Sequence, residues 1–241
     1  MILREWKLSS NELETQNKIL IDYLRQTGIN NAFYYQPGEP EKYWKYDNIR
    51  IGFCNLETYG DSTPGIKSIP SKLLEDWSDG NKTILKTFFI NYCLRWALDN
   101  NLKKISEDTI RQLFKNTRAG QPDYYNMYEA MLYSLYSNFR YSISGKRPAA
   151  NKYIWEQYNN EFYKNNFRKF IQSAELDILL VSTKLGAELI NKIYPEKNGQ
   201  FSYQGKPLFL GKTLAVSIHH PAYISYKEIT NCINKILLSV R

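Results

Sequence analysis

Apolar side chains recur along the chain with two spacings, one typical of helices and one typical of strands. Helices are expected at residues 9–27, 71–100, 107–115, 152–172, 184–194 and 226–240, the second of them interrupted at the polar sequence SDGN. The stretch YEAMLYSLYSNFRYSI, which begins at Tyr128, is expected to pass from a helix into a strand near Leu132. Short β-branched or continuously apolar runs, which indicate strands, fall at residues 48–54, 132–137, 177–183 and 213–218. Because strands and helices alternate, the pattern predicts an α/β protein with a mostly parallel sheet.

The strand pattern also sets the expected domain organisation. A chain of 241 residues with 43% apolar content can bury one large core, so we expect a single domain. Within it, residues 1–48 form an N-terminal helical extension and loop, and residues 49–241 form the α/β core. The expected core is a four-stranded, mostly parallel sheet with helices on both faces.

Composition narrows the expected partners. The 32 Lys and Arg residues against 24 Asp and Glu residues give a net charge of +8, which favours an anionic partner such as nucleic acid. The chain also has 20 tyrosines and 5 tryptophans, and aromatic side chains among basic ones suit stacking on bases. Most of these tyrosines are nevertheless expected in the core or on the general surface.

Other features lead us to expect a cytoplasmic monomer that needs no cofactor. No run of about 18 uncharged apolar residues occurs, and charges interrupt the N-terminal segment where a signal peptide is apolar. We therefore expect no membrane partner. The three cysteines are widely spaced and form no C-x-x-C pair, so we expect neither a disulfide framework nor a metal site.

Both histidines of the chain, His219 and His220, follow the last predicted strand directly. The carboxyl ends of parallel strands are where open α/β sheets bind ligands. Other polar or small residues at the predicted strand ends are Asn55, Glu57, Tyr59, Asn138, Lys184 and Gly186. An acid, two amides, an aromatic ring and a histidine together could hold a flat heterocycle and a water molecule.

Two sequence stretches at these strand ends carry a family resemblance. HHPAYI, from His219 to Ile224, is similar to the His-Pro-Ser motif of the uracil-DNA glycosylase superfamily, with Ala222 where serine is usual. LYSNFRYSI is similar to the family strand whose asparagine hydrogen-bonds the base edge, which corresponds to Asn138. The resemblance spans roughly residues 49–238 as an order of elements rather than as identities.

The first family motif is atypical, and GFCNLETYG fits it in two registers. In one register Glu57 takes the place of the carboxylate that activates water, and Tyr59 that of the tyrosine beside the base. In the other register Asn55 positions the water. The proline usual in this motif is missing, so both registers stay open.

The resemblance implies roles for the remaining residues. His220 would donate a hydrogen bond to the departing base, while His219 would pack or cap on the other side of the strand. Ile224 would fill the gap left by the flipped base, and Lys146 and Arg147 would contact phosphates. Each also has a plainer structural interpretation: a turn at the histidines, a cap at Asn138, and solvated loops elsewhere.

Together these features predict a DNA glycosylase that excises uracil or another modified base from duplex or single-stranded DNA. Two alternatives remain. One is a catalytically inactive nucleic-acid-binding module of the same fold. The other is an unrelated α/β hydrolase, although neither G-x-S-x-G nor a phosphate-binding G-x-x-x-x-G-K motif occurs.

Overall fold

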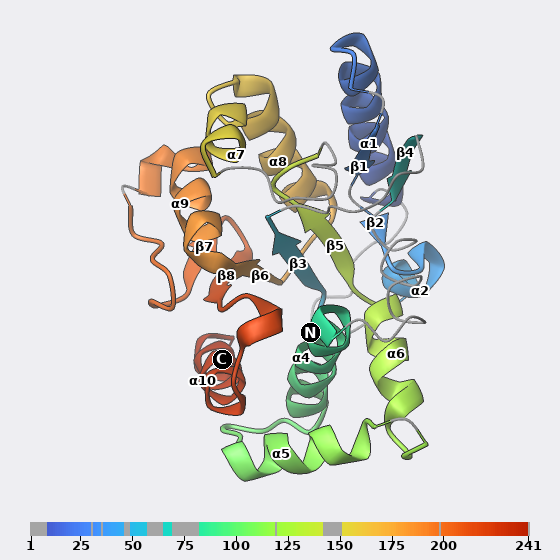
Figure 1. The fold of residues 1–241 in the computed structure, drawn as a ribbon, viewed down its shortest axis with the longest axis vertical. Coiled ribbons are helices and arrows are strands. Elements are labelled where there is room, and N and C mark those ends of the chain that lie inside the picture. The colour runs from blue at the N-terminus through green and yellow to red at the C-terminus, as the bar shows by residue number, and fades with distance from the viewer. Residues whose placement is uncertain are drawn as a thin grey trace.

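A six-stranded sheet lies at the centre of the protein, with helices packed around it (Figure 1). The computed structural model describes residues 9–29, 31–34, 36–45, 49–56, 65–68, 82–118, 120–141, 151–197 and 199–240. The α/β class predicted from the sequence is confirmed.

Four parallel strands form the middle of the sheet. The strands, in spatial order, are β2 (Gln36–Pro37), β5 (Leu135–Asn138), β3 (Ile51–Asn55), β6 (Ile178–Ser182), β8 (Thr213–Ile218) and β7 (Leu208–Leu210). The pairs β5–β3, β3–β6 and β6–β8 are parallel, whereas β2 and β7 pair antiparallel at the two edges. The expected four-stranded sheet therefore contains the right central strands but lacks these two short edge strands. A separate two-stranded parallel sheet joins β1 (Asn31–Tyr34) to β4 (Gly65–Ser68).

The helices described in the structure follow the predicted order, except that α2 falls in a segment expected to be a loop and that two other boundaries differ. They are α1 (Ser9–Gln26), α2 (Pro40–Lys45), α4 (Lys82–Asp99), α5 (Glu107–Asn116), α6 (Tyr124–Leu132), α7 (Asn151–Gln157), α8 (Glu161–Ser173), α9 (Thr183–Ile193) and α10 (Tyr226–Ser239), with short 3₁₀ helices η1 (Pro195–Lys197) and η2 (Pro221–Tyr223). The single helix predicted at 152–172 is two helices, because the Asn160 side chain accepts a hydrogen bond from the Phe162 amide (2.9 Å) and so caps a new helix. The strand predicted at 132–137 begins later, since α6 extends to Leu132. The part of the 71–100 helix before Lys82 lies outside the described residues.

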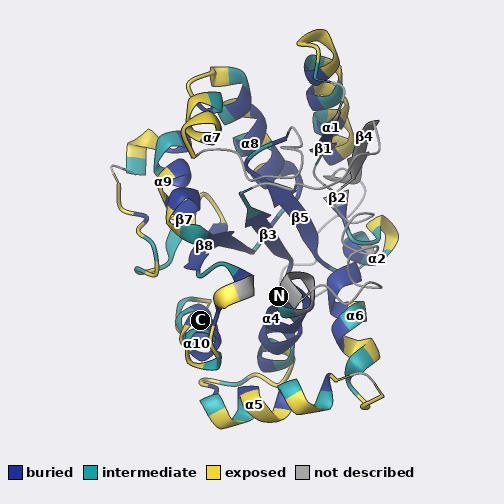
Figure 2. Cartoon of the chain, viewed as in Figure 1, coloured by how far each residue is buried: buried dark blue, intermediate teal, exposed yellow. Residues whose placement is uncertain are grey.

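Helices cover both faces of the sheet and bury two apolar clusters. On one face, Phe53, Tyr136 and Leu180 of the strands pack in a cluster with residues of α4, α5, α6 and α10. On the other face, Cys54 and Val181 belong to a cluster with residues of α1, α7, α8 and α9. Figure 2 shows the central strands buried and the exposed residues concentrated on the outer sides of the helices. Strand residues therefore alternate between the two faces, as the pleat requires.

The strand order defines where a ligand site is expected. In chain order the parallel strands run β3, β5, β6, β8, but in space β3 lies between β5 and β6. The chain thus leaves β3 toward one side, to β5, and then returns to the other side, to β6. Such a reversal between neighbouring strands is the switch point at which open α/β sheets bind ligands, beyond the carboxyl ends of the strands. Here it lies between β3 and β6.

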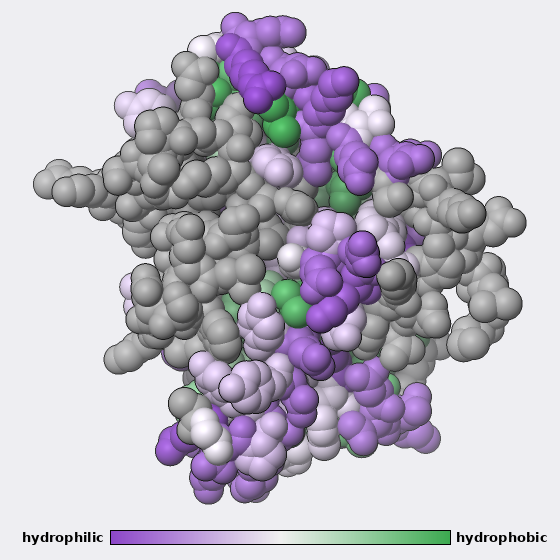
Figure 3. All heavy atoms as spheres, turned by 90° about the vertical axis from the view of Figure 1, so that its right-hand side faces the viewer, coloured by the Kyte–Doolittle hydropathy of each residue, from purple (hydrophilic) through white to green (hydrophobic). Residues whose placement is uncertain are grey.

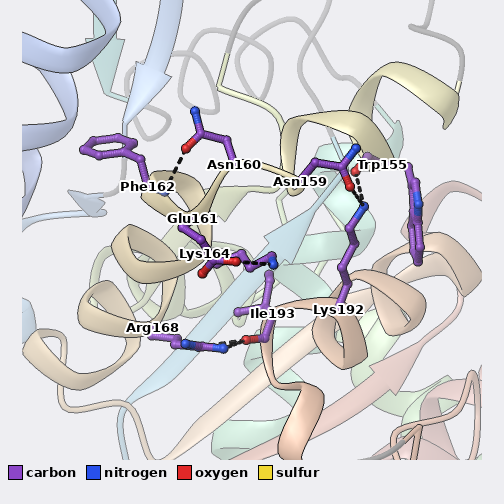
Figure 4. A network of polar contacts seen from close by, with 9 residues as sticks. All are labelled: Trp155, Asn159, Asn160, Glu161, Phe162, Lys164, Arg168, Lys192 and Ile193. Carbon is purple, nitrogen blue, oxygen red and sulfur yellow. Dashed lines mark hydrogen bonds and ion pairs between the residues drawn. The ribbon is translucent and has the colours of Figure 1, made fainter.

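Polar contacts hold the C-terminal end of α9, the end far from the switch point, against its neighbours (Figure 4). Lys192 on α9 donates hydrogen bonds to the Trp155 carbonyl oxygen and to Asn159 Oδ1, both at 2.8 Å, and its ammonium lies 4.2 Å from the centre of the Trp155 ring. Arg168 on α8 donates to the carbonyl oxygen of Ile193, the next residue and the last of the helix. Burial, with the charge of Lys164 as a smaller cause, lowers the pKa of Lys192. These contacts fix α9 against α7 and α8.

The described surface is mostly polar where Figure 3 shows it. On the face that includes α1 and α6, hydrophilic residues predominate among the described ones, and hydrophobic residues are scattered between them. Isolated apolar side chains of this kind do not mark an interface. Among the described helices, none is both long enough and apolar enough to cross a membrane.

Candidate functional site

Asn55 and Asn138 lie side by side at the carboxyl ends of two central strands. They are paired in the register of β3 and β5, and the backbone amides of Phe139 and Arg140 donate to the Asn55 and Leu56 carbonyl oxygens (both 2.8 Å), which continues the ladder past both asparagines. Each asparagine follows by two positions a residue that packs toward α4 and α10. Both amides therefore point to that same face of the sheet.

The two asparagines differ in how far they are buried. Asn138 is only 4% exposed, whereas Asn55 is half-buried. Each amide carries both a hydrogen-bond donor and an acceptor. A buried and a half-buried amide next to each other suit a flat ligand that presents donors and acceptors along one edge.

Ser182, at the end of the next strand, continues the row formed by Asn55 and Asn138. The sequence analysis did not identify it as a site residue. It ends β6, where Cys54 pairs with Val181, so Asn55 and Ser182 each lie one residue past a paired position. Ser182 is 1% exposed, and its hydroxyl has no hydrogen-bond partner among the described residues. A buried hydroxyl without a partner is unfavourable by about 1–3 kcal/mol, which a ligand group could relieve.

The backbone next to Ser182 is strained. Thr183 has φ of 72°, in the left-handed region that β-branched residues rarely adopt. Its side-chain oxygen accepts a hydrogen bond from the Gly186 amide (3.2 Å), which helps to begin α9. Strain of this kind amounts to roughly 1–3 kcal/mol and concentrates at functional sites. In the sequence, Ser182 and Thr183 stand out only as two polar residues that follow an apolar run.

The histidine pair lies at the same edge of the sheet, two strands from β3. Ser182 pairs with Ile218, and His219 and His220 follow Ile218 directly. Adjacent strands are about 4.8 Å apart, so roughly 10 Å separates the backbone of β3 from that of β8. The Tyr223 amide donates to the His220 carbonyl oxygen (2.9 Å), which forms the turn that leads into α10.

The two imidazoles share Tyr223 as a neighbour, and His219 also lies near Tyr203. The His219 ring lies near Tyr203, with 6.1 Å between ring centres, and the His220 ring lies 5.7 Å from Tyr223. Burial, with the neighbouring His219 as a smaller cause, lowers the pKa of His220 below its usual value of 6.5. His220 is therefore a neutral imidazole at pH 7, able to donate one hydrogen bond.

Burial argues against the role expected for Ile224. Its side chain is 5% exposed and packs in the core with Ile218 and Ile229, so it is not available to enter a DNA gap in this conformation. The residue before it, Tyr223, is 77% exposed and borders both histidine rings. Burial of Ile224 follows from its place between η2 and α10, which the H-P-A pattern alone did not reveal.

Four predicted site residues, Glu57, Tyr59, Lys146 and Arg147, lie outside the described residues. Lys184 is exposed on the first turn of α9, and Gly186 is buried there. A Cβ atom at Gly186 would lie 3.0 Å from Val181 Cγ1, so the glycine allows α9 to approach β6 closely.

No group of three or more His, Cys, Asp or Glu side chains able to hold a metal ion occurs within the described ranges. The side chains that gather at the strand ends are instead neutral hydrogen-bonding groups. Their arrangement can bind the edge of a polar, uncharged ring and can donate to an oxygen on it.

Comparison with known proteins adds no relative from which a function could be transferred. The sequence matches no known family model, and no curated protein is significantly similar to it.

Proposed function

We propose that this protein is a DNA glycosylase of the uracil-DNA glycosylase type, which cleaves the bond between the sugar and a modified base flipped out of DNA. The observation that carries the proposal is the pairing of Asn55 with Asn138 at the carboxyl ends of β3 and β5. This pair lies next to the switch point between β3 and β6, where an α/β sheet offers its binding site.

Asn138 is the residue that we assign to base recognition. It is buried, so a base that does not match its amide loses a hydrogen bond at a position shielded from water. Such a loss amounts to about 1–3 kcal/mol, enough to discriminate between bases. Ser182, two strands away on the same face, offers a further hydrogen bond to the same ligand.

Asn55 or Glu57 is assigned to the attacking water. Cleavage breaks the sugar–base bond, the electron pair leaves with the base, and the water oxygen bonds to the sugar carbon while its proton passes to the catalytic carboxylate and from there to the departed base. Positive charge develops on the sugar, which a carboxylate stabilises and an amide does not. If Glu57 is the catalytic group, Asn55 orients the water beside it.

His220 is assigned to the departing base. Its lowered pKa makes it neutral at pH 7, so it stabilises the developing negative charge as a hydrogen-bond donor rather than as a cation. The net charge of +8 supplies the attraction to DNA that the reaction requires.

A nucleic-acid-binding module without catalysis is the second candidate. A missing carboxylate after β3 would favour it, but the sequence has Glu57 two residues beyond Asn55.

A single experiment tests both candidates. The protein is incubated with duplex and single-stranded oligonucleotides that carry uracil or one of several modified bases, and abasic sites are revealed by alkaline cleavage. We expect cleavage with at least one base, loss of cleavage in Asn55→Ala, and reduced discrimination between bases in Asn138→Ala. DNA binding without cleavage across the panel would support the binding module and reject the glycosylase.

A further inference from the structure

A cavity lies beside β8, and Asn55, Asn138 and Ser182 are not among its lining residues. Its volume is about 480 Å³, within the usual range of about 300–1,000 Å³ for small-molecule sites. Strand β7 pairs with β8 only as far as Ala215, so the edge of β8 beyond that residue is not covered by β7. Ser217 and His219 line the cavity from this edge, and residues of α10 line it from the other side.

The carboxylate of this cavity is already hydrogen-bonded within the protein. Glu228 is the one acidic residue in its lining. The Glu228 carboxylate accepts hydrogen bonds from the Ser225 amide (2.8 Å) and from Gln204 Nε2 (3.2 Å), and the first of these is the main cause that lowers its pKa. Glu228 is therefore ionised, but its oxygens are used within the protein.

The donors of the cavity are only partly used. Lys235 donates to the Gln204 and Gly205 carbonyl oxygens (2.5 and 3.1 Å), which leaves one of its three protons. Within the described part of the chain, Lys104 makes no ion pair and no hydrogen bond through its ammonium group. Lys104 and Lys235 are cations and Glu228 is the one carboxylate, so the lining has a net positive charge without any contribution from His219.

Ser217 borders the cavity at the open edge of β8. It is 6% exposed, and its hydroxyl has no hydrogen-bond partner among the residues that the structure describes. Buried polar groups are nearly always satisfied, so an unpaired one calls for an explanation. A ligand oxygen that reaches this hydroxyl would satisfy it.

We propose that the cavity bordered by Ser217, His219, Lys104 and Lys235 binds a phosphate group. Unused donors, a positive balance and an occupied carboxylate together select an anion with several acceptor oxygens. The phosphate has two possible sources, a free mononucleotide or the backbone of a DNA strand. The site is independent of the proposed glycosylase activity, because none of its residues belongs to the assigned catalytic set.

The test is calorimetric titration of the full chain with inorganic phosphate, with thymidine 5′-monophosphate and with a short unmodified oligothymidine. We expect Ser217→Ala and Lys104→Ala each to weaken binding about tenfold, the usual effect of losing a hydrogen bond to a charged group. Ser217→Ala removes an unpaired hydroxyl, so its thermal unfolding should match that of the parent protein. Lys103→Ala and Ser202→Ala, at exposed neighbouring positions outside the lining, are the matched controls.

The pattern across the three probes identifies the source. Binding of the mononucleotide with competition by inorganic phosphate indicates a free ligand. An effect of both substitutions on oligothymidine alone indicates a backbone phosphate. The proposal is overturned if no probe depends on Ser217 and Lys104, or if Lys103→Ala weakens binding as much as Lys104→Ala.

Discussion

Asn55 and Asn138 are 83 positions apart in the sequence and directly paired in the sheet, where their side chains share one face. The pairing places two amides at the carboxyl ends of β3 and β5, beside the switch point between β3 and β6. A ligand edge that meets both asparagines would be bound by rigid strands rather than by a loop. Rigid strands hold recognition groups more accurately than loops do.

The first prediction concerns the two asparagines. Asn138→Ala should reduce discrimination between the preferred base and its competitors by about 1–3 kcal/mol, because a buried amide no longer pairs with the base. Asn55→Ala should reduce the rate of base release while DNA affinity is retained. Single-turnover excision and DNA affinity are measured for both, with Asn126→Ala on exposed α6 as the control. Unchanged excision in both variants would reject the assigned site.

The second prediction concerns Ser182. Its hydroxyl is buried and unpaired among the described residues, so Ser182→Ala should leave the free energy of unfolding unchanged or raise it. The same substitution should weaken the binding of DNA that carries the modified base. Ser137→Ala is the comparison, because the Ser137 hydroxyl donates to the Phe53 carbonyl oxygen (3.1 Å), and its loss should destabilise the protein by about 1 kcal/mol. Equal destabilisation in both variants would mean that Ser182 is a structural residue.

The central fold was predictable because each parallel strand is buried on both faces. Runs such as Ile178–Ser182 are continuously buried, and that burial makes them apolar throughout. The edge strands were not predictable in the same way. Strand β7 has three residues, of which Phe209 is exposed, and it depends on a turn at Gly211 with φ of 64°. The sequence FLGKT contained that glycine, but the run before it was too short to indicate a strand.

The site was predictable only as far as strand ends determine it. Asn55, Asn138 and His220 terminate predicted strands, so a parallel sheet places them at one edge. The burial of Ile224 was not predictable, because it depends on how η2 packs against α4 and α10. The unpaired hydroxyls of Ser182 and Ser217 were equally hidden, since a missing hydrogen bond is a property of the three-dimensional structure.

The third prediction concerns the rate of base release and the two histidines. His220→Ala should lower the single-turnover rate by about 10² to 10³, because one preorganised donor to the departing base is lost. His219→Ala should have a much smaller effect on that rate, and DNA affinity should change little in either variant. Equal losses in the two variants, or a loss confined to binding, would place both histidines in the scaffold or the DNA-contact surface.

The fourth prediction concerns stability and pH. The pKa of His220 is lower in the folded protein than its usual value of 6.5, so the unfolded chain binds a proton more readily as the pH falls below that value. The contribution of His220 should therefore leave stability undiminished above pH 6.5 and lower the free energy of unfolding below it. Urea unfolding across this range should show the decrease in the parent protein and a weaker decrease in His220→Gln. If the free energy of unfolding falls with pH equally in His220→Gln and in the parent protein, another group is responsible.

The last prediction separates Tyr223 from Ile224, neighbours with opposite surroundings. Ile224 is buried among Ile218, Ile229 and their neighbours, so Ile224→Ala should destabilise the protein by about 2–5 kcal/mol through the cavity that it leaves. Tyr223 is 77% exposed beside both histidine rings, so Tyr223→Ala should leave stability nearly unchanged.

If Tyr223 stacks on a base, its loss should weaken DNA binding by about 1–3 kcal/mol, whereas Tyr223→Phe keeps the ring and should bind normally. Exposed Tyr153 on α7 gives a control, Tyr153→Ala, for the general loss of a surface aromatic ring. Weakened binding in Tyr223→Phe, or an equal loss in Tyr153→Ala, would show that stacking at Tyr223 is not what holds the DNA.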